Sequence, residues 1–241
     1  MRARFGILAF LAVMAFSASA HALDASGLYV SGKLGVSFMS ADDATNTSNA
    51  NSSAGSTAGG ALATPSKSLS RGTVMPLGGA IGFDWSKNFN VPIRTELEYL
   101  YRTGFGSRQN PSYTNAAVAT QYSSIGYNQS LMVNAYYDIK EFSKTFVPYV
   151  GGGLGASWNN TTTDSAAAAP GSTWSRGRRS TQDFAWNIGA GVGYSVTDHI
   201  VLDVSYRYSH LGDSAVGEKS SSEQTSTMTA NELLFGVRYV F

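Results

Sequence analysis

Charged residues recur at every second position within several apolar segments, and this arrangement offers the chain's clearest chemistry. They are Lys33, Arg94, Glu96, Glu98, Asp203, Arg207, Glu232 and Arg238. Successive side chains of an extended strand point to opposite faces, so these charges would share the face opposite their apolar neighbours. Charges out of water need partners, because desolvation costs several kcal/mol per ion. The pattern predicts a paired interior network centred on Glu96, Glu98, Arg207 and Arg238, which either stabilises the interior or constricts an ion path.

Other chemical constellations are scarce. His199 falls in a short connection and His210 begins a long one, and no Ser and carboxylate can be placed beside His210 to form a triad. The clusters Gly151–Gly155 and Gly189–Gly193 lack the helix that a phosphate-binding loop opens onto. They are better explained as slots for inward Tyr or Arg side chains. There is no metal-ligand spacing, and the sequence predicts neither an enzyme nor a cofactor.

One local run of positive charge could bind a polyanion. Arg176, Arg178 and Arg179 lie close together in a long polar connection. The run could bind lipopolysaccharide phosphates or a host polyanion by electrostatics. It could equally be a solvated loop tip.

Alternation of apolar and polar residues predicts eight strands. They lie near 27–39, 73–85, 91–102, 125–138, 146–158, 183–196, 200–209 and 227–241. The connections alternate between short and long. The long ones are near 40–72, 103–124, 159–182 and 210–226. This rhythm is typical of outer-membrane barrels, which have short periplasmic turns and longer extracellular loops.

The strand charges occupy the face opposite the apolar face in each strand where parity can be read. Besides the network residues, the inward set includes Asp84, Arg102, Asp138 and Asp183. A soluble barrel would also satisfy this parity. Aromatic residues at strand ends favour the membrane interface instead; they are Trp85, Tyr101, Tyr137, Trp158, Tyr208 and Phe241. The parity of 146–158 stays open.

The N-terminus reads as a secretory signal of residues 1–22. Arg2 and Arg4 precede an apolar run, and cleavage is expected after Ala22 or Ala20. The remainder, 23–241, is expected to form one barrel domain. The chain has no cysteine, and its formal net charge of +1 argues against nucleic acid as a partner.

Several segments resemble the outer-membrane β-barrel family of OmpA-like and opacity-type surface proteins. They are Gly27–Gly35, Arg94–Tyr99, Asn134–Asp138, Pro148–Gly155, Asp203–Tyr208 and Leu234–Tyr239. The resemblance implies that Tyr239 and Phe241 form a C-terminal signal that the barrel-assembly machinery reads. Family members include adhesins, surface antigens and structural barrels. The chain ends with the barrel strands, so the resemblance does not imply the periplasmic domain of OmpA itself.

Together these features predict an all-β, eight-stranded, antiparallel up-and-down transmembrane β-barrel in the bacterial outer membrane. The barrel is expected to be monomeric, with both termini periplasmic. Its expected role is structural or adhesive through the loops, with lipid, lipopolysaccharide and host surface molecules as partners. The alternatives are a small narrow-pore porin, a membrane enzyme and a soluble exported β-sandwich.

Overall fold

The computed structural model describes residues 27–47, 70–108, 120–141, 143, 145–166, 175–216 and 223–241. The expected signal segment 1–22 lies outside these residues. The elements are β1 (Leu28–Thr47), β2 (Ser70–Val74), β3 (Pro76–Asp84), α2 (Ser86–Phe89), β4 (Ile93–Arg108), β5 (Thr120–Asp138), β6 (Phe146–Ala166), β7 (Ser175–Ser195), β8 (Ile200–Val216) and β9 (Glu223–Val240). No helix among the described residues is long and apolar enough to cross a membrane.

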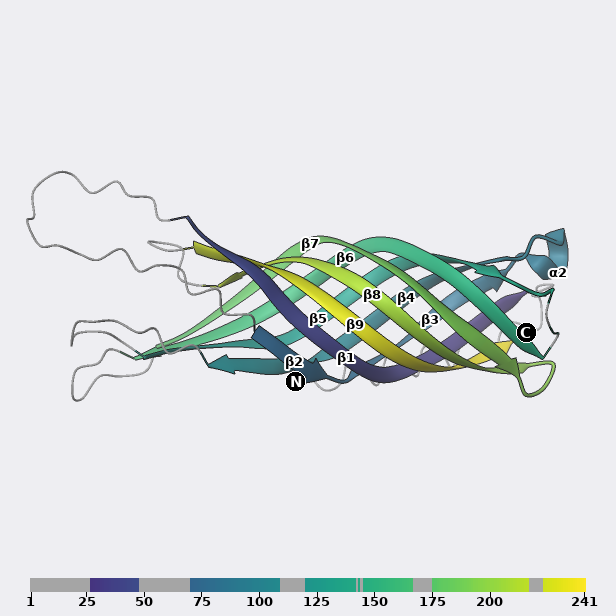
Figure 1. The fold of residues 1–241 in the computed structure, drawn as a ribbon, viewed down its shortest axis with the longest axis horizontal. Helices are drawn as coiled ribbons and strands as arrows, with labels where there is room; N and C mark the ends of the chain where they lie inside the picture. The colour runs from purple at the N-terminus through teal and green to yellow at the C-terminus, as the bar shows by residue number, and fades with distance from the viewer. Residues whose placement is uncertain are drawn as a thin grey trace, which may run out of the picture.

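The strands form one closed antiparallel barrel (Figure 1). β2 and β3 both pair with β1 and make a single barrel position, interrupted at Met75, so the ring has eight positions. Pro76 begins β3, as expected for a residue without a backbone N–H. The predicted eight-stranded up-and-down barrel is confirmed, and the closed ring rules out the β-sandwich alternative.

Closing the ring staggers the strands by ten residues. Following ladder partners from Tyr29 through each strand in turn leads back to β1 at Met39. For eight strands this stagger corresponds to a tilt of about 40° and leaves an interior that side chains can fill. The stagger therefore decides which inward residues face one another.

The predicted alternation of faces is confirmed in the barrel wall. On β9, for example, Phe235 and Val237 are 44% and 55% exposed, whereas Glu232 and Leu234 are buried. The open question of 146–158 is settled as well. Val150 and Leu154 of β6 point outward, and Tyr149 and Ser157 are buried inside.

The strands run further toward the long connections than predicted. β6 and β7 each contain 21 residues. The described parts of the predicted loops at 40–47, 103–108, 159–166 and 210–216 are strand instead. These segments are largely polar and carry no clear apolar alternation, yet their backbones pair with a neighbouring strand apart from local register shifts. The predicted loop boundaries were therefore wrong by several residues at each of these places.

The two barrel ends differ. Short connections lie at the end that holds α2 and the C-terminus, at the right of Figure 1, and the extended strand ends lie at the left. In the turn before β8, the Thr197 hydroxyl accepts hydrogen bonds from the backbone N–H groups of His199 and Ile200. Tyr29 pairs with Val240, so the start of β1 and the C-terminus lie side by side at the short-turn end.

Candidate functional site

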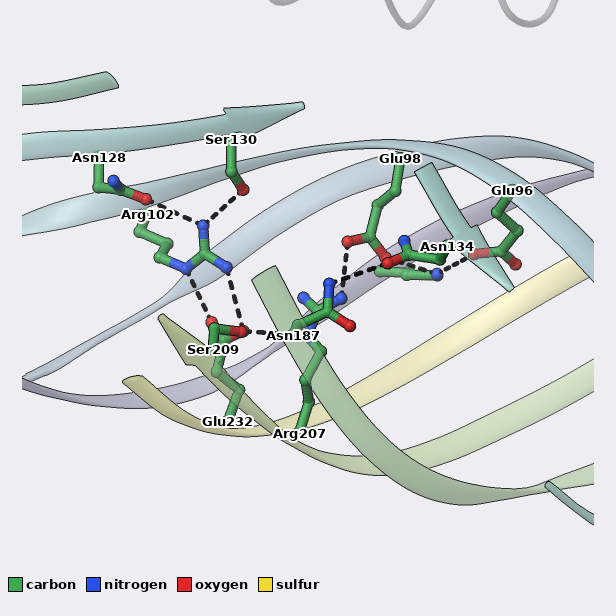
Figure 2. Close-up of polar contacts among 11 residues, drawn as sticks. Glu96, Glu98, Arg102, Asn128, Ser130, Asn134, Asn187, Arg207, Ser209 and Glu232 are labelled. Atoms are coloured by element: carbon green, nitrogen blue, oxygen red, sulfur yellow. Dashed lines mark hydrogen bonds and ion pairs between the residues drawn. The ribbon is translucent and has the colours of Figure 1, made fainter. Parts of the chain in front are cut away.

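A ladder of ion pairs occupies the barrel interior (Figure 2). Lys33 Nζ lies 2.5 Å from Glu96 Oε2 and 2.7 Å from Glu98 Oε2. The other oxygen of Glu98 accepts a hydrogen bond from Arg207 Nη1 at 2.7 Å. Glu98 is fully buried and bridges two cations, from β1 and β8, that are far apart in the sequence.

The ladder continues toward the long-loop end through Glu232. Its carboxylate accepts hydrogen bonds from Arg207 Nε at 3.1 Å and from Ser209 Oγ at 3.0 Å. Arg102 reaches the same carboxylate through Nε at 2.8 Å and Nη2 at 3.0 Å. Arg102 Nη1 in turn donates to Asn128 and Ser130. Each fully buried carboxylate thus meets two cations, which offsets the cost of removing it from water.

Two further ion pairs lie outside this ladder. Arg94 pairs with Asp138, with Nε 2.9 Å from both carboxylate oxygens, and its guanidinium also lies over the rings of Tyr136 and Tyr149. Arg238 pairs with Asp203, Nη2 to Oδ1 3.0 Å.

The placement of Arg238 differs from the sequence interpretation, which put this residue at the network's centre. Its guanidinium lies over the Tyr29 ring at 5.2 Å and pairs with Asp203, not with Glu96 or Glu98. Arg102 occupies the ladder position instead. Which inward side chains meet in the ion-pair ladder depends on how the strands are staggered around the ring. The alternation pattern alone does not give this stagger.

Inward amides form a layer that the sequence interpretation missed. Asn128 Nδ2 donates to Ser157 Oγ and to Asn159 Oδ1, both at 2.7 Å. Asn159 Nδ2 then donates to the Leu211 carbonyl at 3.0 Å. These amides could have been found from the sequence, because each is a polar residue at a strand position that faces inward. The inward charges were identified in the same way.

An apolar cluster fills the interior beyond the amides, and it too was missed. Its members are Met39, Val74, Leu211, Met228 and Ala230, all at most 4% exposed. On β9 the outward side chains at this level are polar, namely Thr227, Thr229 and Asn231. The barrel therefore reverses its polarity along its length, with apolar residues outside at the short-turn end and inside at the long-loop end.

A small polar cavity lies beside the ladder. It measures about 30 Å³ and is lined by Lys33, Arg94, Glu96, Asp203 and Arg207 among others. Nη2 of Arg94 and Nη2 of Arg207 have no hydrogen-bond partner in the protein. A cavity of this size and polarity has room for about two water molecules.

Glycines receive the inward tyrosines and arginines, as predicted. A Cβ on Gly191 would lie 2.6 Å from Tyr149 Oη, and one on Gly189 would lie 3.2 Å from Arg207 Cβ. A Cβ on Gly151 would collide with the Tyr136 ring. These strands accept large side chains from their neighbours because glycine leaves space for them.

The arginine run lies on a strand, not in a loop. Ser175 begins β7, so Arg176, Arg178 and Arg179 are strand residues paired with β6. Arg178 is exposed.

Asp183, also on β7, accepts hydrogen bonds from the backbone N–H groups of Phe184 and Asp213, both at 2.7 Å.

Neither described histidine sits in a catalytic arrangement. The His210 ring stacks on Trp186 at 5.7 Å, and His199 Nδ1 lies 2.9 Å from the Val240 carbonyl oxygen. Within the described ranges, no group of three His, Cys, Asp or Glu residues could hold a metal ion.

Aromatic side chains mark both edges of the outward apolar band. Toward the long loops, Tyr101 stacks on Tyr127 and Trp186 contacts Tyr208. At the short-turn end the contacts are Trp85 with Phe83 and Phe89, Phe146 with Tyr194, and Tyr239 with His199 and Phe241. Two aromatic girdles around an apolar band are the mark of a barrel in lipid.

Comparison with known proteins agrees with this arrangement. The model of the outer membrane protein beta-barrel domain matches residues 8–241. Outer membrane protein PagN of Salmonella typhimurium is 27% identical over the whole of both chains. Among solved structures, Neisserial surface protein A has a TM-score of 0.44 at 18% identity, covering 90% of this chain and 98% of its own. OprG of Pseudomonas aeruginosa has a TM-score of 0.45 at 13% identity, covering 90% and 97%. On the strength of the family match, the chain belongs to the outer membrane protein β-barrel family.

Proposed function

We propose that this outer-membrane barrel is a surface protein that presents its long connections well outside the lipid, for a structural or adhesion-type role. The observation that carries the proposal is the reversal of polarity along the barrel. Apolar side chains face outward up to the ring of Tyr101, Tyr127, Trp186 and Tyr208, and beyond it the outward side chains that the structure describes, such as Thr73 and Thr229, are polar. We call the strand segments beyond this ring the crown: 39–47, 70–74, 103–108, 120–126, 159–166, 175–183, 209–216 and 223–231.

The length of the strands supports this placement. A tilted strand of about ten residues crosses the hydrocarbon core of a bilayer. β6 and β7, with 21 residues each, have about ten to spare. At about 3.3 Å per residue and this tilt, the crown would rise roughly 25 Å above the lipid. An apolar interior with a polar exterior is what a barrel needs in water, so the crown can be stable there.

The proposed orientation puts the crown outside the cell and both termini in the periplasm. The chain has no cysteine, so single cysteines report position cleanly. Ser180→Cys in the crown should react, on intact cells, with a maleimide too bulky to pass porins. Asp198→Cys in a short turn should react only after the outer membrane is opened. Labelling of Asp198→Cys on intact cells would reverse the orientation.

The adhesive part of the proposal is tested by replacing the connections between crown strands with short turns. Such a barrel should insert normally but bind host cells less than the wild type does. Adhesion and serum survival equal to wild type, with the shortened barrel present in the membrane, would leave only the structural role.

A narrow pore is the second candidate, favoured by the polar cavity lined with Lys33, Glu96 and Arg207. Against it, the ion-pair ladder and the apolar cluster fill the interior on the crown side of this cavity. Single-channel recording in planar bilayers separates the two. Steady unitary currents from the folded protein would favour the pore.

A further inference from the structure

The crown is split along two seams. Backbone pairing between β7 and β8 ends at Trp186 and His210. In the described part of the chain, β8 beyond His210 pairs only with β9. Across the other seam, β3 pairs with β4 up to Pro76 and Arg102, and the Thr103 N–H still donates to the Met75 carbonyl. Above this point β2 pairs only with β1 among the described residues. The crown therefore consists of two sheets, β8–β9–β1–β2 and β4–β5–β6–β7. The tips of β1 and β9 lie well apart from those of β6 and β7 in Figure 1.

The split between β7 and β8 has a local cause. The register of β8 against β9 shifts between His210 and Asp213, and Gly212 adopts a φ of +72°, which favours glycine. A Cβ at Gly212 would collide with the side chain of Asp183 on β7. The Asp183 carboxylate accepts a hydrogen bond from the Asp213 N–H, so a side-chain contact joins β7 and β8 at the point where their backbone pairing stops. This contact forms the floor of the seam.

Above the floor, β7 is the last strand of its sheet. Its segment Ser175–Ser180 is paired to β6 on one side and has no ladder partner in the described residues of β8 on the other. The edge of a sheet presents a row of backbone donors and acceptors that can pair with an added strand. This edge also carries three arginines in six residues and no acidic residue.

The cross-strand register places two of the three arginines opposite uncharged residues. Arg178 and Arg179 stand opposite Thr162 and Thr161 of β6, and only Arg176 faces an acid, Asp164. Of the three, the side chain of Arg178 is exposed. A strand added at this edge would therefore lie beside the exposed Arg178.

We propose that the Ser175–Ser180 edge of β7 binds an extended acidic peptide by strand addition. The backbone edge selects an extended chain, and the arginines select carboxylate side chains. The inference rests on the proposed exposure of the crown outside the cell, but binding to purified protein does not depend on orientation in the cell. Failure of the cysteine-labelling experiment and failure of the binding experiment are therefore distinguishable.

The probe is a synthetic peptide that alternates Glu with Val and Thr, titrated against the folded protein in lipid nanodiscs. The double variant Arg178→Gln/Arg179→Gln removes two of the three positive charges of this edge and should weaken binding about tenfold. Arg71→Gln is the matched control, because Arg71 is an exposed crown arginine on β2, in the other sheet. It should change the affinity by less than about twofold.

A second probe tests the backbone contact separately from the charge. The same peptide with every backbone nitrogen methylated keeps its carboxylates but has no N–H to donate, and it should bind at least about tenfold more weakly. Equal binding of the methylated peptide would overturn strand addition, because charge alone would then suffice. Binding of a heparin oligosaccharide without binding of the peptide would also overturn the proposal and assign the edge to sulfated polysaccharides. Absence of peptide binding to the folded protein would overturn it outright.

Discussion

Arg102 on β4 and Glu232 on β9 meet inside the barrel through two parallel hydrogen bonds, although 130 residues separate them in the sequence. Both side chains are almost completely buried. Their strands are not neighbours in the ring, so the pair spans the interior instead of following the wall. It ties opposite parts of the barrel together at the level where the polar interior gives way to the amide layer.

Removing Glu232 should strongly destabilise the barrel. Glu232→Ala leaves the buried guanidinium groups of Arg102 and Arg207 without this carboxylate, and breaking a buried ion pair from one side costs about 3–5 kcal/mol. Urea unfolding of the protein in lipid vesicles, followed by tryptophan fluorescence, measures the loss. Glu141→Ala, an exposed turn position, is the control. Similar unfolding midpoints for the two variants would mean that the ladder contributes nothing to stability.

Loss of Glu98 tests whether the ladder also blocks ion flow. Glu98→Ala unpairs both Lys33 and Arg207, so we expect a fall in stability of about 3–5 kcal/mol. The apolar cluster and the Arg102–Glu232 pair should still close the interior, so planar-bilayer recordings should show no new steady current. Unchanged stability would contradict the stabilising role of these ion pairs, and a new steady current would mean that Glu98 itself closes the interior.

Polarity reversal can be tested within β9 alone. Met228→Asp buries a carboxylate in the apolar cluster and should destabilise the crown, whereas Thr229→Asp faces outward and should be tolerated. Nearer the C-terminus the outward face of β9 meets lipid, so there a charge on the outward face is unfavourable. Phe235→Asp should therefore impair insertion, at a cost of about 2–4 kcal/mol or less depending on depth. Heat-modifiable migration on SDS gels, together with urea unfolding, reports all three. Equal tolerance of Met228→Asp and Thr229→Asp would contradict an apolar crown interior.

Glycine slots predict a difference between two alanine substitutions. Gly191→Ala would place a methyl group 2.6 Å from both the Tyr149 hydroxyl and the Val204 carbonyl oxygen, so the wall must shift, at a cost of about 1–3 kcal/mol. Gly32→Ala on β1 has open space around the new methyl group and should be neutral or slightly stabilising. Unfolding midpoints that do not differ would show that Tyr149 can move aside freely.

The C-terminal aromatic residue should matter more for assembly than for stability. The Phe241 N–H donates to the Leu28 carbonyl at 3.0 Å, and its ring contacts Tyr239 at the seam where β9 meets β1. Phe241→Ala should therefore lower the amount of folded barrel in cells while the purified chain still refolds in detergent. Phe89→Ala, an exposed aromatic residue at the same barrel end, is the control. Equal cellular amounts of the two variants would argue against a role for Phe241 as an assembly signal.

The wall of the barrel could be predicted from the sequence because alternation is a local property. It placed Glu98 and Arg207 inside and Phe235 outside without knowledge of any neighbour. The partners could not be predicted in the same way, since they depend on strand register and on the stagger of the closed ring. Arg238 meets Asp203 through the register of β8 against β9, whereas Arg102 reaches Glu232 across the interior. The crown was missed because its strands are polar on the outside, and its buried Met39 and Met228 reverse the rule that identified the wall.

The ten-residue stagger has a consequence for how such a chain can change in length. Inserting one residue into the wall of β8 would turn every later side chain of that strand to the other face, so that Arg207 or its neighbours would meet hydrocarbon. Inserting two would restore the faces but move Arg207 away from Glu98 and Glu232. The wall is thus constrained first by parity and then by pairing, while the connections above the crown are bound by neither. Changes in length can accumulate at that end of the molecule without disturbing the part held in the membrane.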